Sequence, residues 1–234
     1  DGSYGVKFRK EGRITMSLEN YFPIWEKLTS AQQDKLNGCV IDKLFKKGES
    51  VLHREGDCNG LLLIQTGRLR VYILSEGGRE ITIYRLLDMD LCLFSASWMM
   101  NSIQFDVMVK AEKDTRVFII PAKIYKEIME ESAVVANYTN EIMASSFSDV
   151  MWLIEQIMWK SLDKRVAGFL MEEMVLEGTM KLNLTHETIA NHLGTHREVI
   201  TRMLRYFQDE GMVKLARGMV EVLDSKRLQQ LHEE

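Results

Sequence analysis

The stretch LTHETIANHLGTHREVITRML, residues 184–204, decides the fold of this chain, because it predicts two short helices joined by a glycine turn. Thr185 is placed to cap the first helix with its hydroxyl group. Gly194 can adopt the left-handed conformation that ends a helix. Thr195 followed by Glu198 fits a capping box, so a second helix is expected to begin at once. The pair is typical of proteins that present side chains to the edges of DNA bases.

The second helix and the segment after it extend this pattern. Its outer side carries polar and basic side chains, namely His196, Arg197, Glu198, Thr201, Arg202 and Arg205. After it, residues 212–216 and 219–223 alternate like two strands, with Arg217-Gly218 at the bend. An ordinary helical hairpin with a solvated charged face would explain the charges but not the hairpin of strands. The sequence therefore favours a winged helix-turn-helix.

The run from Gly194 to Arg202 resembles the family of the cyclic AMP receptor protein and FNR, the CRP/FNR family. In that family an arginine, a glutamate and a second arginine at this spacing bind the base pairs of a TGTGA-like half-site. The resemblance assigns these roles to Arg197, Glu198 and Arg202. Arginine can donate two hydrogen bonds to guanine, and glutamate can accept one from cytosine, so the chemistry is consistent. His196, Thr201, Thr185 and Arg217 are expected to assist or to touch phosphate.

The amino-terminal half predicts many short strands between glycine turns, a pattern typical of a sandwich or jelly roll. The expected strands are residues 44–45, 51–52, 61–64, 69–74, 81–86, 107–109 and 116–120. The marks Phe45, Gly48, Gly56, Asp57, Gly67 and Val71 are similar to those of the cyclic-nucleotide-binding roll. The resemblance covers residues 21–223. It implies an α+β fold with a cyclic-nucleotide-binding-like β jelly roll, a long dimerisation helix and a carboxy-terminal winged helix-turn-helix.

The residues that bind the cyclic phosphate in the family are replaced in this chain. Leu93-Phe94 stand where the family has Gly-Glu, and Phe105-Asp106 stand where it has Arg-Ser. A cyclic phosphate needs a cation and hydrogen-bond donors, which an aromatic ring and a carboxylate do not supply. The family's base-contacting Thr-Ser pair falls near Val150-Met151, which removes two hydroxyl groups. We therefore predict that cyclic AMP is not the ligand of the roll.

Two interpretations of the roll interior stay open, an unknown small-molecule effector and a self-packed core without a ligand. The candidate lining is mostly apolar and adaptable. It comprises Leu93, Phe94, Trp98, Met99, Phe105, Asp106, Met108, Val150 and Met151.

A long helix without glycine or proline is expected over residues 133–160. Apolar residues recur along it at a spacing of 4, 3, 4 and 3, which is typical of a seam for a partner helix. This seam comprises Met143, Phe147, Val150, Ile154 and Ile157. Tyr138, Ile142 and Met151 extend a second apolar face, so the helix needs two partners. We expect the roll on one face and a second subunit on the other; the alternative is a helix buried within one subunit.

Length and composition limit the possible domain organisation, partners and cellular location. The 234 residues divide into a flexible start (1–20), the roll (21–132), the helix (133–160) and the winged domain (161–234). The net charge of −4 does not exclude DNA binding, which needs only a local basic patch. Three scattered cysteines fit a reducing cytoplasm, and no apolar run approaches the ~20 residues of a membrane span.

These patterns point to a cytoplasmic, homodimeric regulator that binds double-stranded DNA and is not an enzyme. Three cysteines are too few for an iron–sulfur cluster, and His53, the one histidine of the roll, is expected on a strand surface rather than bound to a haem. His186, His192 and His196 are expected on helix surfaces rather than as metal ligands, so no metal or cofactor is expected. The alternatives are a cyclic-nucleotide-type adaptor or regulatory subunit without DNA binding, and a cupin-type metalloenzyme. The sequence does not decide whether RNA polymerase is recruited or blocked by the bound protein.

Overall fold

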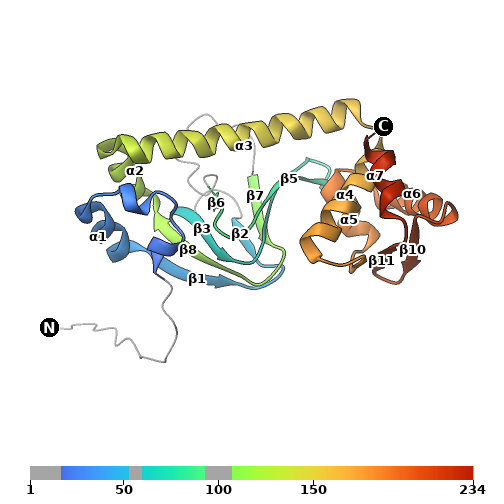
Figure 1. The fold of residues 1–234 in the computed structure, drawn as a ribbon, viewed down its shortest axis with the longest axis horizontal. Helices are drawn as coiled ribbons and strands as arrows, with labels where there is room; N and C mark the ends of the chain where they lie inside the picture. The colour runs from blue at the N-terminus through green and yellow to red at the C-terminus, as the bar shows by residue number, and fades with distance from the viewer. Residues whose placement is uncertain (1–16, 53–59, 93–106, 234) are drawn as a thin grey trace, which may run out of the picture.

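The computed structural model describes residues 17–52, 60–92 and 107–233. It shows a β-roll, a long helix and a smaller helical domain, in that order along the chain (Figure 1). The α+β architecture predicted from the sequence is therefore confirmed.

Two four-stranded antiparallel sheets form the described part of the roll. The first contains, in spatial order, β1 (Ile41–Phe45), β8 (Thr115–Pro121), β3 (Gly60–Thr66) and β6 (Leu91–Cys92). The second contains β2 (Ser50–Leu52), β7 (Val107–Ala111), β4 (Leu69–Leu74) and β5 (Glu80–Leu86). Each strand expected from the sequence is present.

Strand β3 shows why the first sheet is covered on both sides. Leu62 and Ile64 pack inside the roll, and Leu61 and Leu63 pack on the opposite face of the sheet. All four side chains are fully buried, as expected when a strand is an unbroken apolar run rather than an alternating one. The amino-terminal segment and helix α2 (Ala122–Glu131) pack against the outer face of β3.

Regular structure begins closer to the amino terminus than predicted. Residues 17–20 were expected to belong to a flexible start, but η1 (Leu18–Asn20) is a 3-10 helix and Leu18 is only 2% exposed. It is followed by η2 (Trp25–Lys27) and α1 (Ser30–Cys39), which begins with the expected capping box between Thr29 and Gln32. Burial of apolar side chains against the sheet holds this segment, so the prediction was wrong for residues 17–20.

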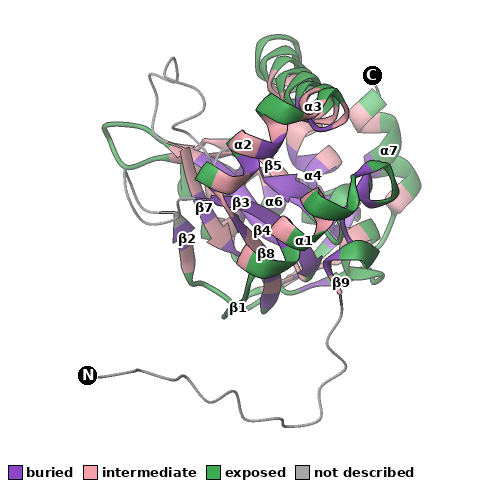
Figure 2. Cartoon of the chain, turned by 90° about the vertical axis from the view of Figure 1, so that its left-hand side faces the viewer, coloured by how far each residue is buried: buried purple, intermediate pink, exposed green. Residues whose placement is uncertain are grey.

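Helix α3 (Ala133–Trp159) runs as one rod along the roll and reaches the second domain (Figure 1). Tyr138 and Ile142 pack against the roll, as predicted for the second apolar face, but Met151, assigned to the same face, is 47% exposed on the outward side. Viewed along its axis in Figure 2, the helix has exposed residues on its outward side. Among the described residues, no helix is both long and apolar enough to cross a membrane.

The carboxy-terminal domain is a winged helix-turn-helix. Its elements are α4 (Leu162–Glu177), β9 (Lys181–Leu182), α5 (His186–Leu193), α6 (Arg197–Asp209), β10 (Val213–Ala216), β11 (Met219–Val222) and α7 (Ser225–Glu233). The three strands form one sheet in the order β10-β11-β9, and Gly218 makes the wing turn with a φ of 70°. Lys160, between α3 and α4, donates a hydrogen bond of 3.2 Å to the carbonyl group of His232 in α7.

Candidate DNA interface and the contacts that orient it

The turn between α5 and α6 is built largely as the sequence predicts. The Thr185 hydroxyl group accepts a hydrogen bond of 3.0 Å from the Thr188 backbone amide and caps α5. Gly194 has a φ of 69°, which ends α5 in the left-handed conformation. The expected capping box of Thr195 and Glu198 is wrong: α6 begins one residue later, and its N-cap residue, His196, makes no side-chain cap bond.

Packing fixes which side of α6 faces outward. Ile200, Leu204 and Phe207 are fully buried in the core of the winged domain. Because these residues occupy one side of the helix, Glu198 and Arg202, one turn apart, lie on the opposite side. Both are exposed.

The exposed side of α6 is locally basic despite the acidic chain. Arg197, Arg202 and Arg205 are exposed and form no ion pair with any carboxylate of the described residues. The charge also affects His186 on α5. Burial lowers the pKa of its imidazole, and the positive charges of Arg197 and Arg205 lower that pKa further. A local cationic patch of this kind is what a phosphate backbone attracts.

The remaining predicted contact residues lie around this patch. His196 is exposed at the start of α6, and Arg217 is exposed in the wing turn. Thr201 is half-buried: its hydroxyl group donates to the carbonyl group of Arg197 at 2.9 Å and lies 2.8 Å from Nδ1 of His186. Thr185 and Thr201 thus hold the helix pair together, and a phosphate contact by either stays a prediction.

The predicted effector pocket is described only in part. Six of its residues, Leu93, Phe94, Trp98, Met99, Phe105 and Asp106, lie outside the described residues. Met108 is half-buried in β7, and Val150 packs against the core of the roll. Met151 is 47% exposed, because it lies one turn from Phe147 on the outward side of α3. Its assignment to the pocket stays a prediction.

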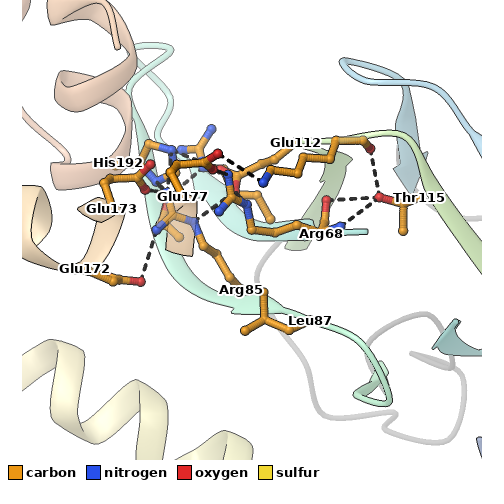
Figure 3. Close-up of polar contacts among 12 residues, drawn as sticks. Arg68, Arg85, Leu87, Glu112, Thr115, Glu172, Glu173, Glu177 and His192 are labelled. Atoms are coloured by element: carbon orange, nitrogen blue, oxygen red, sulfur yellow. Dashed lines mark hydrogen bonds and ion pairs between the residues drawn. The ribbon is translucent and has the colours of Figure 1, made fainter. Parts of the chain in front are cut away.

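A largely buried group of charged and polar side chains joins the roll to the winged domain (Figure 3). We call it the interdomain cluster. It comprises Arg68, Thr82, Arg85 and Glu112 from the roll, and Glu172, Glu173, Glu177 and His192 from α4 and α5.

Arg85 and Glu112 are the centre of this cluster. Arg85 Nε lies 2.9 Å from Glu112 Oε2, and Arg85 Nη1 lies 3.0 Å from Glu172 Oε1. The same guanidinium group pairs with Glu173, whose side chain is almost fully buried. Arg68 Nε lies 2.8 Å from Glu112 Oε2, and Arg68 Nη2 donates a hydrogen bond of 2.6 Å to Glu177 Oε1. Each arginine therefore links the roll to α4.

His192 completes the cluster from α5. Its Nε2 lies 3.0 Å from Glu112 Oε1, and its Nδ1 lies 2.8 Å from the Thr82 hydroxyl group. Burial lowers the pKa of His192 to about 4, although the hydrogen bond to Glu112 opposes this shift. Burial alone would raise the pKa of Glu112, but the bond from His192 and the charge of Arg85 lower it to about 2. We therefore assign a neutral imidazole whose Nε2–H donates to an ionised Glu112.

Sequence reasoning missed this cluster and placed His192 on a helix surface. The structure corrects that prediction: His192 is 7% exposed. One signal was available, since His192 follows Ile189 by three residues and so shares the buried side of α5. Glu173 likewise follows Phe169 by four residues on the apolar side of α4.

The cluster leaves the basic side of α6 free. The contacts with the roll are made by α4 and α5, including a backbone bridge between Ile81 and Leu193. A β-roll joined by a long helix to a winged helix-turn-helix with an exposed basic second helix defines a DNA-binding regulator.

Comparisons with known proteins agree with this class. Residues 42–132 match the cyclic nucleotide-binding domain, and residues 164–231 match the Crp-like helix-turn-helix domain. The crystal structure of a regulator assigned to the CRP/FNR family from Eubacterium rectale is 64% identical, with a TM-score of 0.90 over 92% of this chain and 100% of that one.

Two curated relatives are more distant. The cyclic AMP receptor protein of Thermus thermophilus is 22% identical over 210 residues, covering 89% of this chain and 96% of the relative. The transcriptional activator protein anr of Pseudomonas aeruginosa is 26% identical over 210 residues, covering 86% and 84%. The chain belongs to the CRP/FNR family of DNA-binding transcription regulators.

Proposed function

We propose that two copies of the chain associate along α3 and bind a palindromic DNA site with TGTGA-like half-sites. The observation that carries this proposal is the pairing of an exposed apolar seam on α3 with an exposed basic face on α6. A second copy of the chain packs against the seam, and the basic face contacts DNA.

The seam is unusually apolar for a free surface. Met143, Phe147, Ile154 and Ile157 are between 39% and 66% exposed in the single chain. Met151 and Met158 widen the same side. The fifth predicted seam residue, Val150, is half-buried and packs partly against the roll. A helix of 27 residues spans about 40 Å, enough for a two-fold interface that separates two winged domains.

The proposed base contacts are Arg197, Glu198 and Arg202. The unpaired guanidinium groups are free to donate two hydrogen bonds to guanine, and the Glu198 carboxylate can accept from cytosine. Arg217 in the wing and His196 at the start of α6 are proposed to contact phosphate. Thr185 and Thr201 assist by holding the two helices in register. Bound near a promoter, the dimer would recruit or block RNA polymerase.

The roll is proposed not to bind cyclic AMP. At the positions of the family's base-contacting hydroxyl groups, the described side chains are Val150, packed against the roll, and Met151, exposed on the far side of α3. Neither can donate a hydrogen bond to a purine. A different signal acting on the roll would shift α3 and reorient the winged domains, by favouring one of two arrangements.

Selection of bound fragments from a random pool of double-stranded DNA tests the proposal. The expected product is a two-fold symmetric site with TGTGA-like halves, one DNA turn or ~34 Å between their centres. A selected site with a single half, or no enrichment at all, would contradict it.

A further inference from the structure

A cavity of about 500 Å³ lies where the roll, α3 and the winged domain meet. Its walls come from β5, α3, α4, α5 and α7, so both domains contribute. The volume falls in the range of ~300–1,000 Å³ typical of sites for small organic molecules. Met108 and Val150, from the predicted pocket of the roll, are not among its walls. The cavity thus differs from that predicted pocket in every described residue.

Arg165 gives the cavity an unpaired positive charge. Its Nη2 donates a hydrogen bond of 2.7 Å to the carbonyl group of Leu193, and no carboxylate of the described residues pairs with it. The buried arginines Arg68, Arg70 and Arg85, by contrast, all pair with glutamates. Burial lowers the pKa of the Arg165 guanidinium group. A partly desolvated guanidinium group attracts a carboxylate or phosphate strongly.

Trp152 gives the cavity an aromatic surface. It lines the cavity from α3 and is 57% exposed, which leaves its ring available. Trp152 lies two residues from both Val150 and Ile154, or about 200° around the helix from the seam. A second copy on the seam would therefore not cover it. Gln156, one turn further along, adds an amide group to the same wall.

The other lining residues include apolar side chains and two carboxylates, those of Asp149 and Glu172. Glu172 is paired with Arg85. Ile83, Leu153, Phe169 and Leu176 contribute aliphatic and aromatic surface around the charged group. A mostly apolar cavity with a few convergent polar groups is the usual form of a ligand site.

We propose that this junction cavity binds a small planar organic anion, an aromatic ring that carries one carboxylate or phosphate group. The ring packs against Trp152, and the anionic group pairs with Arg165. Because His192 and Arg85 of the interdomain cluster also line the cavity, an occupant contacts both domains and favours their docked arrangement. The proposal does not depend on the assignment of the base contacts.

Three ligands that share the same naphthalene ring system test the charge requirement. Isothermal titration calorimetry on the full chain compares 1-naphthoate, 1-naphthyl phosphate and the neutral 1-naphthamide. The better anion is expected to bind at least tenfold more tightly than the amide, and its identity distinguishes a carboxylate ligand from a phosphate ligand. Equal affinities for anion and amide, or no binding of either anion, would overturn the proposal.

Variants locate the site. Gln156→Trp places a large ring on the cavity wall and should weaken binding of the better anion at least tenfold. Arg165→Gln should remove the preference for the anion over the amide. Arg79→Gln, which removes an exposed arginine outside the cavity lining, is the matched control and should leave the affinity unchanged.

The outcome stays decisive if Arg165→Gln fails to fold, since it also loses the bond to Leu193. In that case Gln156→Trp and the three-ligand comparison each test the site alone, with circular dichroism to verify that the variant is folded. Undiminished binding by folded Gln156→Trp would place the anion elsewhere. No DNA is present in these titrations, so their failure is distinguishable from a failure of the proposed DNA site.

Discussion

At the scale of residues, two sets of arginines have opposite environments. Arg68 and Arg85 are buried in the roll and pair with glutamates of α4, which holds the two domains together. Arg197 and Arg202 are exposed and unpaired within the described chain, so their donors are available to DNA. The first set fixes the position of the winged domain, and the second set faces outward from it.

The base-contact assignment predicts different effects for two exposed arginines. Arg202→Ala should cost ~1–3 kcal/mol on the selected site and relax the preference at one base pair. Arg217→Ala should weaken all sequences about equally, because a phosphate contact carries no sequence information. Competition binding with single-base variants of the site measures both effects. An unchanged preference in Arg202→Ala would show that another residue contacts that base pair.

The interdomain cluster predicts a dependence of stability on pH. The pKa of His192 falls from 6.5 to about 4 on burial, so the unfolded chain binds a proton that the folded chain does not between these values. Stability is thus highest above pH ~6.5 and falls toward pH 4, by at most ~1.4 kcal/mol per pH unit from this group. The lowered pKa of Glu112, about 2 instead of 4.5, adds a further loss below pH 4.5.

Urea unfolding at a series of pH values measures this effect. His192→Gln keeps an amide donor for Glu112 but removes the titrating group, so its stability should fall less steeply between pH 6.5 and 4. His196→Gln removes an exposed histidine and serves as the control. Identical pH profiles for the wild type and His192→Gln would contradict the assignment of a buried neutral imidazole.

At the scale of elements, helix α3 has two apolar sides with different partners. Tyr138 and Ile142 face the roll, whereas Phe147 and Ile154 are exposed in the single chain. The heptad-like spacing predicted both sides because it depends only on helix periodicity. Val150 shows the limit of that inference, since its half-burial against the roll depends on tertiary packing.

The seam predicts the oligomeric state. Phe147→Glu places a charge in the middle of the proposed interface and should convert the dimer into monomers, because an unpaired charge is costly to bury. Ser145→Glu adds the same charge at an exposed position on the same helix, away from the seam, and should leave the dimer intact. Light scattering after gel filtration distinguishes the two. A wild-type chain that is already monomeric would contradict the proposed dimer interface along α3.

Much of the winged domain was predictable from local signals. Thr185 as a cap, Gly194 as a left-handed terminus and Gly218 at the wing turn are positions where a single residue's chemistry sets the backbone. The interdomain cluster was not predictable in this way. Glu112 and His192 are 80 residues apart in sequence, and nothing local shows that their side chains meet.

At the scale of the whole molecule, the roll and the winged domain lie side by side beneath one rod (Figure 1). In this docked arrangement, the cluster between them fixes the direction of α6 relative to α3. In a dimer joined along α3, the two basic faces would therefore have a fixed separation. The account depends on this rigidity, because two DNA half-sites are bound together only when their spacing matches the protein.

Affinity as a function of half-site spacing tests this central claim most directly. The equilibrium dissociation constant is measured on the selected palindrome and on the same halves separated by about five additional base pairs, half a DNA turn. The insertion rotates one half-site to the opposite side of the duplex, so the account predicts a loss of affinity of at least tenfold. Equal affinity for both fragments would show that the two recognition helices do not bind as a fixed pair.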